Sequence, residues 1–258
     1  MNTLASEWLK VRSVRSTYLN LVLSLGSVLL GVAVAWTSAG MYDSAPLHRR
    51  AQAALTELEE VVVIVPQLCM GIMGVLAFTS EHVTGMLRTS FTVVPRRWPV
   101  LMAKSAVIGL LGLLAGAITV FGTYFLCRLV VGDRFSGVYT TPFLERLPTL
   151  VTTSLSVPVF ALLGLGAGAI LRSTAGAVAT LVGLAYVIPM ICGNLPEPWS
   201  ERLGSLMIGG LPRQITGADL THSVYGSQLA PWAAAAVMAV YATLPILAGA
   251  LLVRRRAA

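Results

Sequence analysis

The clearest group of side chains that could do chemistry is a row of hydroxyls inside a long apolar stretch, Pro148–Leu171. The row consists of Thr149, Thr152, Thr153 and Ser156. Their i, i+3, i+4, i+7 spacing puts them on one face of a helix. They could line the outer part of a substrate route between two subunits. Alternatively, each hydroxyl bonds a carbonyl of its own helix, an interpretation that the pattern supports at least as well.

Side chains for catalysis or metal binding do not cluster. The cysteines fall in apolar stretches and the histidines stand alone in connections: Cys69, Cys127, Cys192, His48, His82 and His222. No spacing among them is typical of a metal site or a disulfide framework, and the cysteines are expected to be small packing residues. We predict no catalytic residue, no metal site and no cofactor bound by this chain.

A phosphate-binding loop is missing from the sequence. Such a loop needs a glycine directly before its lysine, because that lysine must reach the β- and γ-phosphates. The only lysines, Lys10 and Lys104, follow leucine and alanine. The chain therefore has no P-loop ATP site, and ATP-driven transport by this chain would need a separate subunit that hydrolyses ATP.

Glycine pairs predict close contacts between helices. Gly112 with Gly116, and Gly164 with Gly168, have small-x-x-x-small spacing. Gly164–Gly168 superficially resembles a dinucleotide-binding loop, but no strand precedes it. We expect both pairs to pack within the subunit rather than across a dimer.

Six stretches without a charged residue or histidine must position these side chains. Each is long enough to cross a hydrocarbon core about 30 Å thick at about 1.5 Å per residue. They are Tyr18–Ala39, Val61–Thr79, Ser105–Cys127, Pro148–Leu171, Ala175–Gly193 and Pro231–Val253. A mean hydropathy of +0.79 and only 11% charged residues agree with this interpretation. The sequence predicts an all-α membrane protein: one transmembrane domain, residues 1–258, with six transmembrane helices.

Charge predicts the orientation. The termini and the connections on their side carry eleven Lys and Arg against two acids, whereas the other side carries seven against nine. The positive-inside rule then puts both termini in the cytoplasm. Arg outnumbers Lys 16 to 2 and Ala is abundant, which is typical of a GC-rich bacterial genome. We expect the bacterial plasma membrane, with the basic rim facing anionic lipid rather than nucleic acid.

One connection on each side of the membrane stands out by its length. Arg172–Thr174 predicts a tight turn on the cytoplasmic side. Asn194–Ala230, on the outer side, is the longest connection and is apolar around Leu203–Leu211. It is either a short helical pair that dips toward the membrane or an ordered outer cap.

The connection after the second stretch contains a short apolar stripe. Val83, Leu87, Phe91 and Val94 recur at helical spacing, and Pro95 then ends the pattern. Such a helix lies flat on the membrane or docks on a partner. The alternative is an ordinary interfacial loop with basic anchors.

This connection resembles the ABC-2-type permease family, the membrane subunits of ATP-binding cassette exporters. The matching elements are Glu81, Gly85-Met86-Leu87, Pro95–Arg97 and Lys104, with Met86 in place of the commoner threonine. In that family this segment is the coupling helix that contacts the ATPase. The resemblance thus assigns ATPase coupling to a set of eight residues: Glu81, Gly85, Leu87, Arg88, Phe91, Pro95, Arg97 and Lys104.

The N-terminal segment Ser6–Thr17 is similar to the opening of small permeases of the same family. Leu4, Trp8, Val11 and Tyr18 fall near one helix face, which predicts a short interfacial helix with Trp8 at headgroup level. The resemblance implies a dimer, formed with a second copy or a similar permease. It also implies two cytoplasmic ABC ATPase subunits, which would hold ATP and Mg²⁺.

We therefore expect a permease subunit of a bacterial exporter, without enzymatic activity of its own. The expected substrate is amphipathic, such as an antibiotic or antimicrobial peptide. The main alternative is an ion-coupled secondary transporter. It is disfavoured because none of the six stretches contains an ionisable residue, which such transporters normally use as the coupling site. A membrane enzyme or sensor is disfavoured because the outer connections lack a clustered His, Asp or Glu set.

Overall fold

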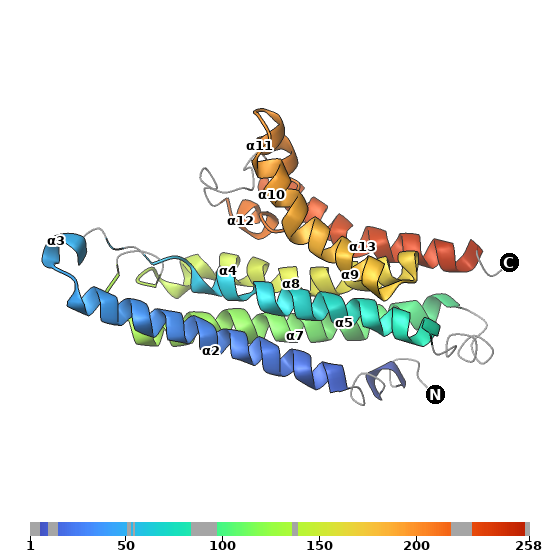
Figure 1. Ribbon diagram of the computed structural model, residues 1–258, viewed down its shortest axis with the longest axis horizontal. Helices are drawn as coiled ribbons and strands as arrows, with labels where there is room; N and C mark the ends of the chain where they lie inside the picture. The colour runs from blue at the N-terminus through green and yellow to red at the C-terminus, as the bar shows by residue number, and fades with distance from the viewer. Residues whose placement is uncertain are drawn as a thin grey trace.

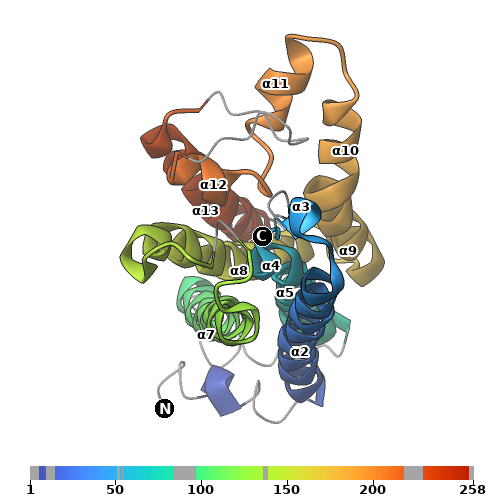
Figure 2. The same ribbon diagram turned by 90° about the vertical axis from the view of Figure 1, so that its left-hand side faces the viewer.

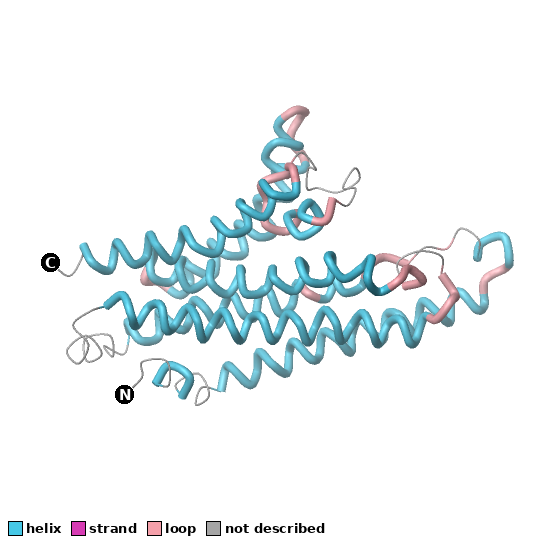
Figure 3. Tube along the Cα trace, turned by 180° about the vertical axis from the view of Figure 1, so that it is seen from behind, coloured by secondary structure: helices cyan, strands magenta, loops and turns pink. Residues whose placement is uncertain are grey.

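The computed structural model describes residues 6–9, 15–50, 53, 55–83, 97–135, 139–217 and 229–255. Within these residues the chain forms helices and connecting loops but no strand (Figure 3). The longer helices are α2 (Arg15–Ser44), α5 (Ile64–Val83), α7 (Arg97–Val131), α8 (Phe143–Leu171), α9 (Thr174–Val182) and α13 (Pro231–Arg255). The shorter ones are α3 (Leu47–Arg50), α4 (Leu58–Val62), α10 (Ile188–Gly193), α11 (Trp199–Gly204), α12 (Leu211–Ile215) and a π-helical turn, η1 (Gly183–Val187).

Six segments of the described chain are helices long and apolar enough to cross a membrane. They are Ser16–Ser44, Leu58–Ser80, Val100–Val131, Phe143–Leu171, Thr174–Gly193 and Pro231–Leu252. Two parts of the predicted fold class are confirmed: the described chain is all-α, and it has six helices long and apolar enough to cross a membrane. The cytoplasmic position of the termini, the interfacial N-terminal helix and the coupling helix stay predictions. Both ends of the chain lie at the same end of the bundle (Figure 1), as an even number of spans requires.

The long helices pack in layers (Figures 1 and 2). Helices α2 and α7 form one outer layer, α5 and α8 the middle layer, and α9 and α13 the other outer layer. Helix α8 packs against α5, α7 and α13, so it is the centre of the bundle. Its span is the most buried of the six, because 72% of an 18-residue segment of it lies inside the structure.

The glycine pairs lie where α8 meets its neighbours, as predicted. A methyl group at Gly164 would overlap the carbonyl oxygen of Gly71 in α5, and one at Gly168 would lie 3.0 Å from the carbonyl oxygen of Val75. Gly112 and Gly116 of α7 meet α8 in the same way. The prediction that both pairs pack within the chain is confirmed. Small residues let the backbones approach closely enough for dispersion contacts to hold the helices together.

Enlarging Gly164 should therefore destabilise the bundle. We expect Gly164→Val to lower the free energy of unfolding by about 1–3 kcal/mol or more, because the added atoms meet backbone that cannot rotate away. The matched control is Gly26→Val in α2, where an added Cβ meets nothing within 4 Å. Thermal unfolding of the purified variants measures the difference, and equal midpoints for both would contradict the packing assignment.

The tight turn after the fourth span is confirmed. Helix α8 ends at Leu171, and α9 begins at Thr174. Arg172 adopts a left-handed conformation (φ 53°), and its N–H donates to the carbonyl of Gly168. Ser173 caps α9, because its hydroxyl accepts a hydrogen bond from the N–H of Gly176 at 3.3 Å.

The expectation that no ionisable residue lies within a span is wrong. The helices continue past the apolar stretches, so the candidate spans also contain charged residues near their ends: Asp43, Glu59, Glu60, Lys104, Arg128, Glu145 and Arg146. The second span begins at Leu58 rather than Val61, because α4 is followed directly by α5 with only Val63 between them. Glu59, at the start of this span, is almost fully buried, with 1% of its surface exposed.

The long connection after the fifth span forms short helices, as one of the two interpretations predicted. Helix α12 packs against α13 and α8, and Leu211 is fully buried. The fifth span itself is not a regular α-helix. It passes through η1, where the N–H of Ile188 donates to the carbonyl of Gly183, and ends with α10. Helix α11 follows after a short loop, and α10 and α11 extend away from the rest of the bundle (Figure 1).

Candidate functional site

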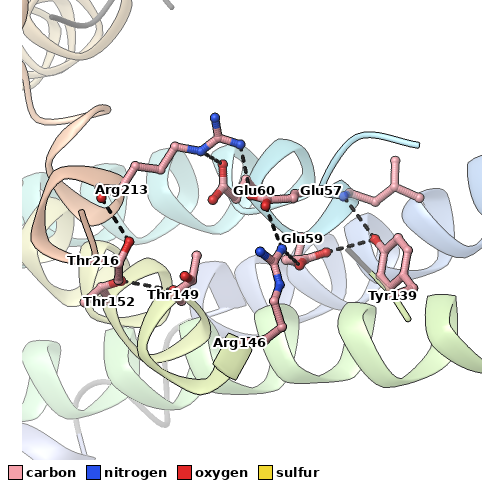
Figure 4. Close-up of polar contacts among 10 residues, drawn as sticks. Glu57, Glu59, Glu60, Tyr139, Arg146, Thr149, Thr152, Arg213 and Thr216 are labelled. Atoms are coloured by element: carbon pink, nitrogen blue, oxygen red, sulfur yellow. Dashed lines mark hydrogen bonds and ion pairs between the residues drawn. The ribbon is translucent and has the colours of Figure 1, made fainter. Parts of the chain in front are cut away.

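A cluster of charged side chains lies at the end of the bundle opposite the termini, where three connections meet. Glu57, Glu59 and Glu60 come from the start of α4, Arg146 from the first turn of α8, and Arg213 from α12. We call these five residues the charged cluster. Arg213 and Arg146 approach the acids from different elements, so the cluster joins α4, α8 and α12 (Figure 4).

Glu57 bridges the two arginines. Its Oε1 accepts a hydrogen bond from Nη2 of Arg146 at 2.6 Å, and its Oε2 accepts one from Nη2 of Arg213 at 2.9 Å. Arg213 also donates from Nε to Oε2 of Glu60 at 2.5 Å. Charge-assisted bonds of this kind are about twice as strong as neutral ones. Arg213 thus fastens the short helix α12 to the start of the second span.

Glu59 is held from another direction. Its Oε2 accepts a hydrogen bond from the hydroxyl of Tyr139 at 2.9 Å, and that hydroxyl accepts one from the N–H of Leu58 at 3.1 Å. Nη2 of Arg146 lies 3.7 Å from the other oxygen, Oε1. The tyrosine satisfies an N–H at the beginning of α4 as well as the buried carboxylate, which fixes where this helix starts.

The environment shifts the pKa values of three groups of the site that lie outside the spans, Glu57, Arg213 and Tyr139. Burial by itself would raise the pKa of Glu57, but hydrogen bonds with Glu60 and Arg146 and the charge of Arg213 lower it below its ordinary value. Burial would lower the pKa of Arg213, yet Glu60 and Glu57 raise it. Burial, followed by the charge of Glu59, raises the pKa of Tyr139. Glu57 and Arg213 are therefore a charged pair at neutral pH, and Tyr139 is a neutral donor.

The charged cluster borders a cavity of about 290 Å³. Its walls come from α4, α5, α8, η1 and α12, and its polar lining consists of Thr56, Glu57, Glu60, Gln67, Thr153, Ser156, Tyr186 and Arg213. Val61, Ile64, Phe160 and Ala185 contribute apolar surface. The π-helical turn η1 supplies one wall, and such turns are frequent at functional sites.

The predicted row of hydroxyls divides at this cavity. Thr153 and Ser156 line it, whereas Thr149 and Thr152 do not. The hydroxyl of Thr152 donates to the carbonyls of Pro148 and Thr149, and that of Ser156 donates to the carbonyl of Thr153 at 2.6 Å. Ser156 also accepts from Nε2 of Gln67 at 2.7 Å, which joins α8 to α5. Bonding to the same helix thus accounts for Thr152, while Thr153 and Ser156 border an internal space.

The residues assigned to ATPase coupling lie mostly outside the described residues. Gly85, Leu87, Arg88, Phe91 and Pro95 fall in residues 84–96, which the structure does not describe. Glu81 is near the end of α5, and Arg97 begins α7. Their coupling role stays a prediction.

Lys104, the last residue of that set, lies inside α7 and is buried. Its Nζ is 2.7 Å from Oε2 of Glu7, and the two side chains are only 7% and 4% exposed. The helical residues 6–9 are therefore attached to the first turns of α7. This contact brings together the two sequence segments that carry the family resemblance.

The fold and the site define a multi-pass helical membrane protein with a charged cluster and a polar cavity at one end. No protein-family model matches this sequence, and no curated protein matches it either. Among the described residues, no three His, Cys, Asp or Glu side chains are grouped so that they could hold a metal ion.

Sequence reasoning missed the charged cluster. The available signal was the run of Glu57, Glu59 and Glu60 directly before an apolar stretch, with three arginines in one of the two other connections on the same side and two in the other. A membrane-adjacent group of acids needs partners, because burying an unpaired carboxylate costs several kcal/mol.

Proposed function

We propose that this protein is the membrane-spanning permease subunit of a bacterial ABC exporter. A separate cytoplasmic ATPase supplies the energy, and the chain moves an amphipathic substrate out of the cell. Two permease copies, or this chain with a similar permease, form the transmembrane part. ATP binding closes the ATPases, presses on the coupling segment near residues 81–104, and shifts the paired bundles between inward- and outward-open states.

One observation carries the proposal. The two segments that resemble the permease family, at residues 6–17 and 80–104, are linked by the buried Glu7–Lys104 ion pair. Ion pairs that are buried and hydrogen-bonded hold elements in one geometry. A push on the coupling segment would therefore reach both α7 and the N-terminal helix. The polar cavity lies toward the opposite end of the bundle, where a substrate would leave.

A second candidate, an ion-coupled secondary transporter, is favoured by Glu59. This carboxyl is buried within the second candidate span, and an ionisable residue in a span is commonly a coupling site. In this structure, however, the carboxyl group of Glu59 already accepts a hydrogen bond from Tyr139 and lies beside Arg146. These contacts favour a structural role for Glu59.

We expect an ABC ATPase to be encoded beside this chain, and reconstitution with that ATPase is the decisive experiment. We expect the two proteins to co-purify, and we expect substrate-stimulated ATP hydrolysis in proteoliposomes. Charge reversal by Glu81→Lys or Arg88→Glu should lower the amount of substrate transported per ATP hydrolysed about 10-fold or more. Each variant replaces an attractive interface contact by a repulsive one.

The bundle of these variants should remain folded, which thermal unfolding checks. Glu145→Lys, a charge reversal of an exposed residue in the first turn of α8, is the matched control. Unchanged coupling in both Glu81 and Arg88 variants would rule out the coupling-segment assignment. Uptake driven by an ion gradient without nucleotide would support the secondary transporter instead.

A further inference from the structure

We propose that the cavity beside the charged cluster binds the cationic group of an amphiphile, an ammonium or guanidinium, with Glu60 and Thr153 as its main polar contacts. This inference rests on the proposed function and names the class of substrate. The apolar part of the ligand would lie along Val61 and Ile64.

The carboxyl groups of the cluster outnumber its guanidinium groups. Three carboxyl groups, those of Glu57, Glu59 and Glu60, face the two guanidinium groups of Arg146 and Arg213. Among the described residues, Oε1 of Glu60 is buried without a hydrogen-bond partner. A carboxylate oxygen that has left water without gaining a donor is costly, so a donor that enters the cavity gains this unmade interaction.

A second unsatisfied group lines the same cavity from another helix. Thr153 is 3% exposed, and its hydroxyl has no hydrogen-bond partner within the described chain. Its neighbour Thr152 shows the usual alternative, since that hydroxyl bonds carbonyls of its own helix. An unpartnered hydroxyl on a residue that lines the cavity supplies the kind of acceptor that the N–H groups of an ammonium or guanidinium require.

The size and the walls of the cavity favour an amphiphile over an inorganic ion. About 290 Å³ holds a small organic cation but is too large for a bare metal ion. Val61 and Ile64 belong to the cavity wall and are also 53% and 39% exposed, so an apolar surface continues from the cavity to the outside of the bundle. Phe160 also lines the cavity, and an aromatic ring can attract a cation.

Arg213 gives the site a way to open and close. Its guanidinium contacts Glu60 and Glu57 at the edge of the cavity and comes from α12, in the long outer connection. An incoming cation would compete with Arg213 for the same carboxylates. Binding would therefore loosen α12 from α4, and the return of Arg213 would help to displace the ligand.

The test is a binding titration of the full chain in lipid nanodiscs, without any ATPase. The probe is monodansylcadaverine, whose dansyl fluorescence rises in apolar surroundings and whose other end is a primary ammonium. Its matched anion is dansyl-6-aminohexanoic acid. We expect the cation to bind and the anion not to bind at the same concentrations.

Three variants locate the site. Glu60→Gln should raise Kd for the cation about 10- to 100-fold, and Thr153→Val about 3- to 10-fold, as expected for loss of a charged and a neutral contact. Arg213→Gln should lower Kd, because the competing guanidinium is gone. Glu145→Gln, an exposed acid outside the cavity, is the control and should leave Kd unchanged. Thermal unfolding shows which variants are folded, and Thr153→Val reports on the site even where Glu60→Gln is not folded.

Equal affinity of wild type, Glu60→Gln and Thr153→Val would overturn the proposal, as would equal binding of cation and anion. If Glu57 and Glu60 share a proton and bind no ligand, Glu60→Gln should leave the affinity unchanged, because glutamine can replace the protonated acid. Weaker binding to Arg213→Gln would contradict the competition. Failure of the chain to co-purify with an ATPase would leave these titrations intact, so the two proposals fail separately.

Discussion

Replacing Arg146 by methionine should lower the free energy of unfolding by about 3–5 kcal/mol, because it leaves the buried Glu59 without a cation and Glu57 with Arg213 alone. Arg146 is hydrogen-bonded to Glu57 at 2.6 Å and lies 3.7 Å from Glu59. Glu59 is 1% exposed and keeps only the hydroxyl of Tyr139 as a partner. Methionine fills similar space, so the loss would be electrostatic rather than a matter of packing.

An exposed ion pair provides the control for the Arg146 variant. Arg134 pairs with Asp43 at 3.0 Å, but the two side chains are 40% and 55% exposed. Arg134→Met removes the same guanidinium and should cost no more than about 1 kcal/mol. Equilibrium unfolding in mixed micelles compares the two. Adding Glu59→Gln to Arg146→Met should recover part of the lost stability. Equal stability of Arg146→Met and Arg134→Met would show that the charged cluster stabilises the fold no more than an exposed ion pair does.

Most of the fold could be predicted from hydropathy and glycine spacing. An uninterrupted apolar stretch of about 20 residues has few alternatives to a membrane-spanning helix. Gly164 and Gly168 predicted an internal contact because only a close neighbour makes small residues favourable on an apolar helix. Where the helices end was less predictable. Helix α4 starts at Leu58, since Tyr139, far along the chain, bonds its first N–H.

The charged cluster could not be predicted for the same reason. Glu57, Arg146 and Arg213 lie in three separate connections, and nothing local brings them together. Their contact depends on how α8 and α12 pack against the second span. Hydropathy assigns each of them to the rim, where a charge is normally solvated. Burial of Glu59 follows only when Tyr139 and Arg146 cover it. The row of hydroxyls was visible in the sequence, but which of them face a cavity was not.

Replacing Lys104 by methionine should also lower the free energy of unfolding by about 3–5 kcal/mol. The ammonium of Lys104 lies 2.7 Å from the carboxylate of Glu7, and both side chains are nearly inaccessible to solvent. Methionine removes this charged contact at a place that is nearly closed to solvent. The attachment of residues 6–9 to α7 is therefore weakened. Equilibrium unfolding in mixed micelles measures the loss, and Glu7→Leu alone should be comparably destabilising.

The double variant Glu7→Leu, Lys104→Met separates stability from coupling. Replacing both members of a buried ion pair by apolar residues is often neutral or stabilising, so most of the stability should return. If the pair also transmits force from the coupling segment, ATP-driven transport should stay low in this folded variant. Full transport in the double variant would restrict the pair to a structural role. A double variant no more stable than the single ones would show that other contacts hold the N-terminal helix to α7.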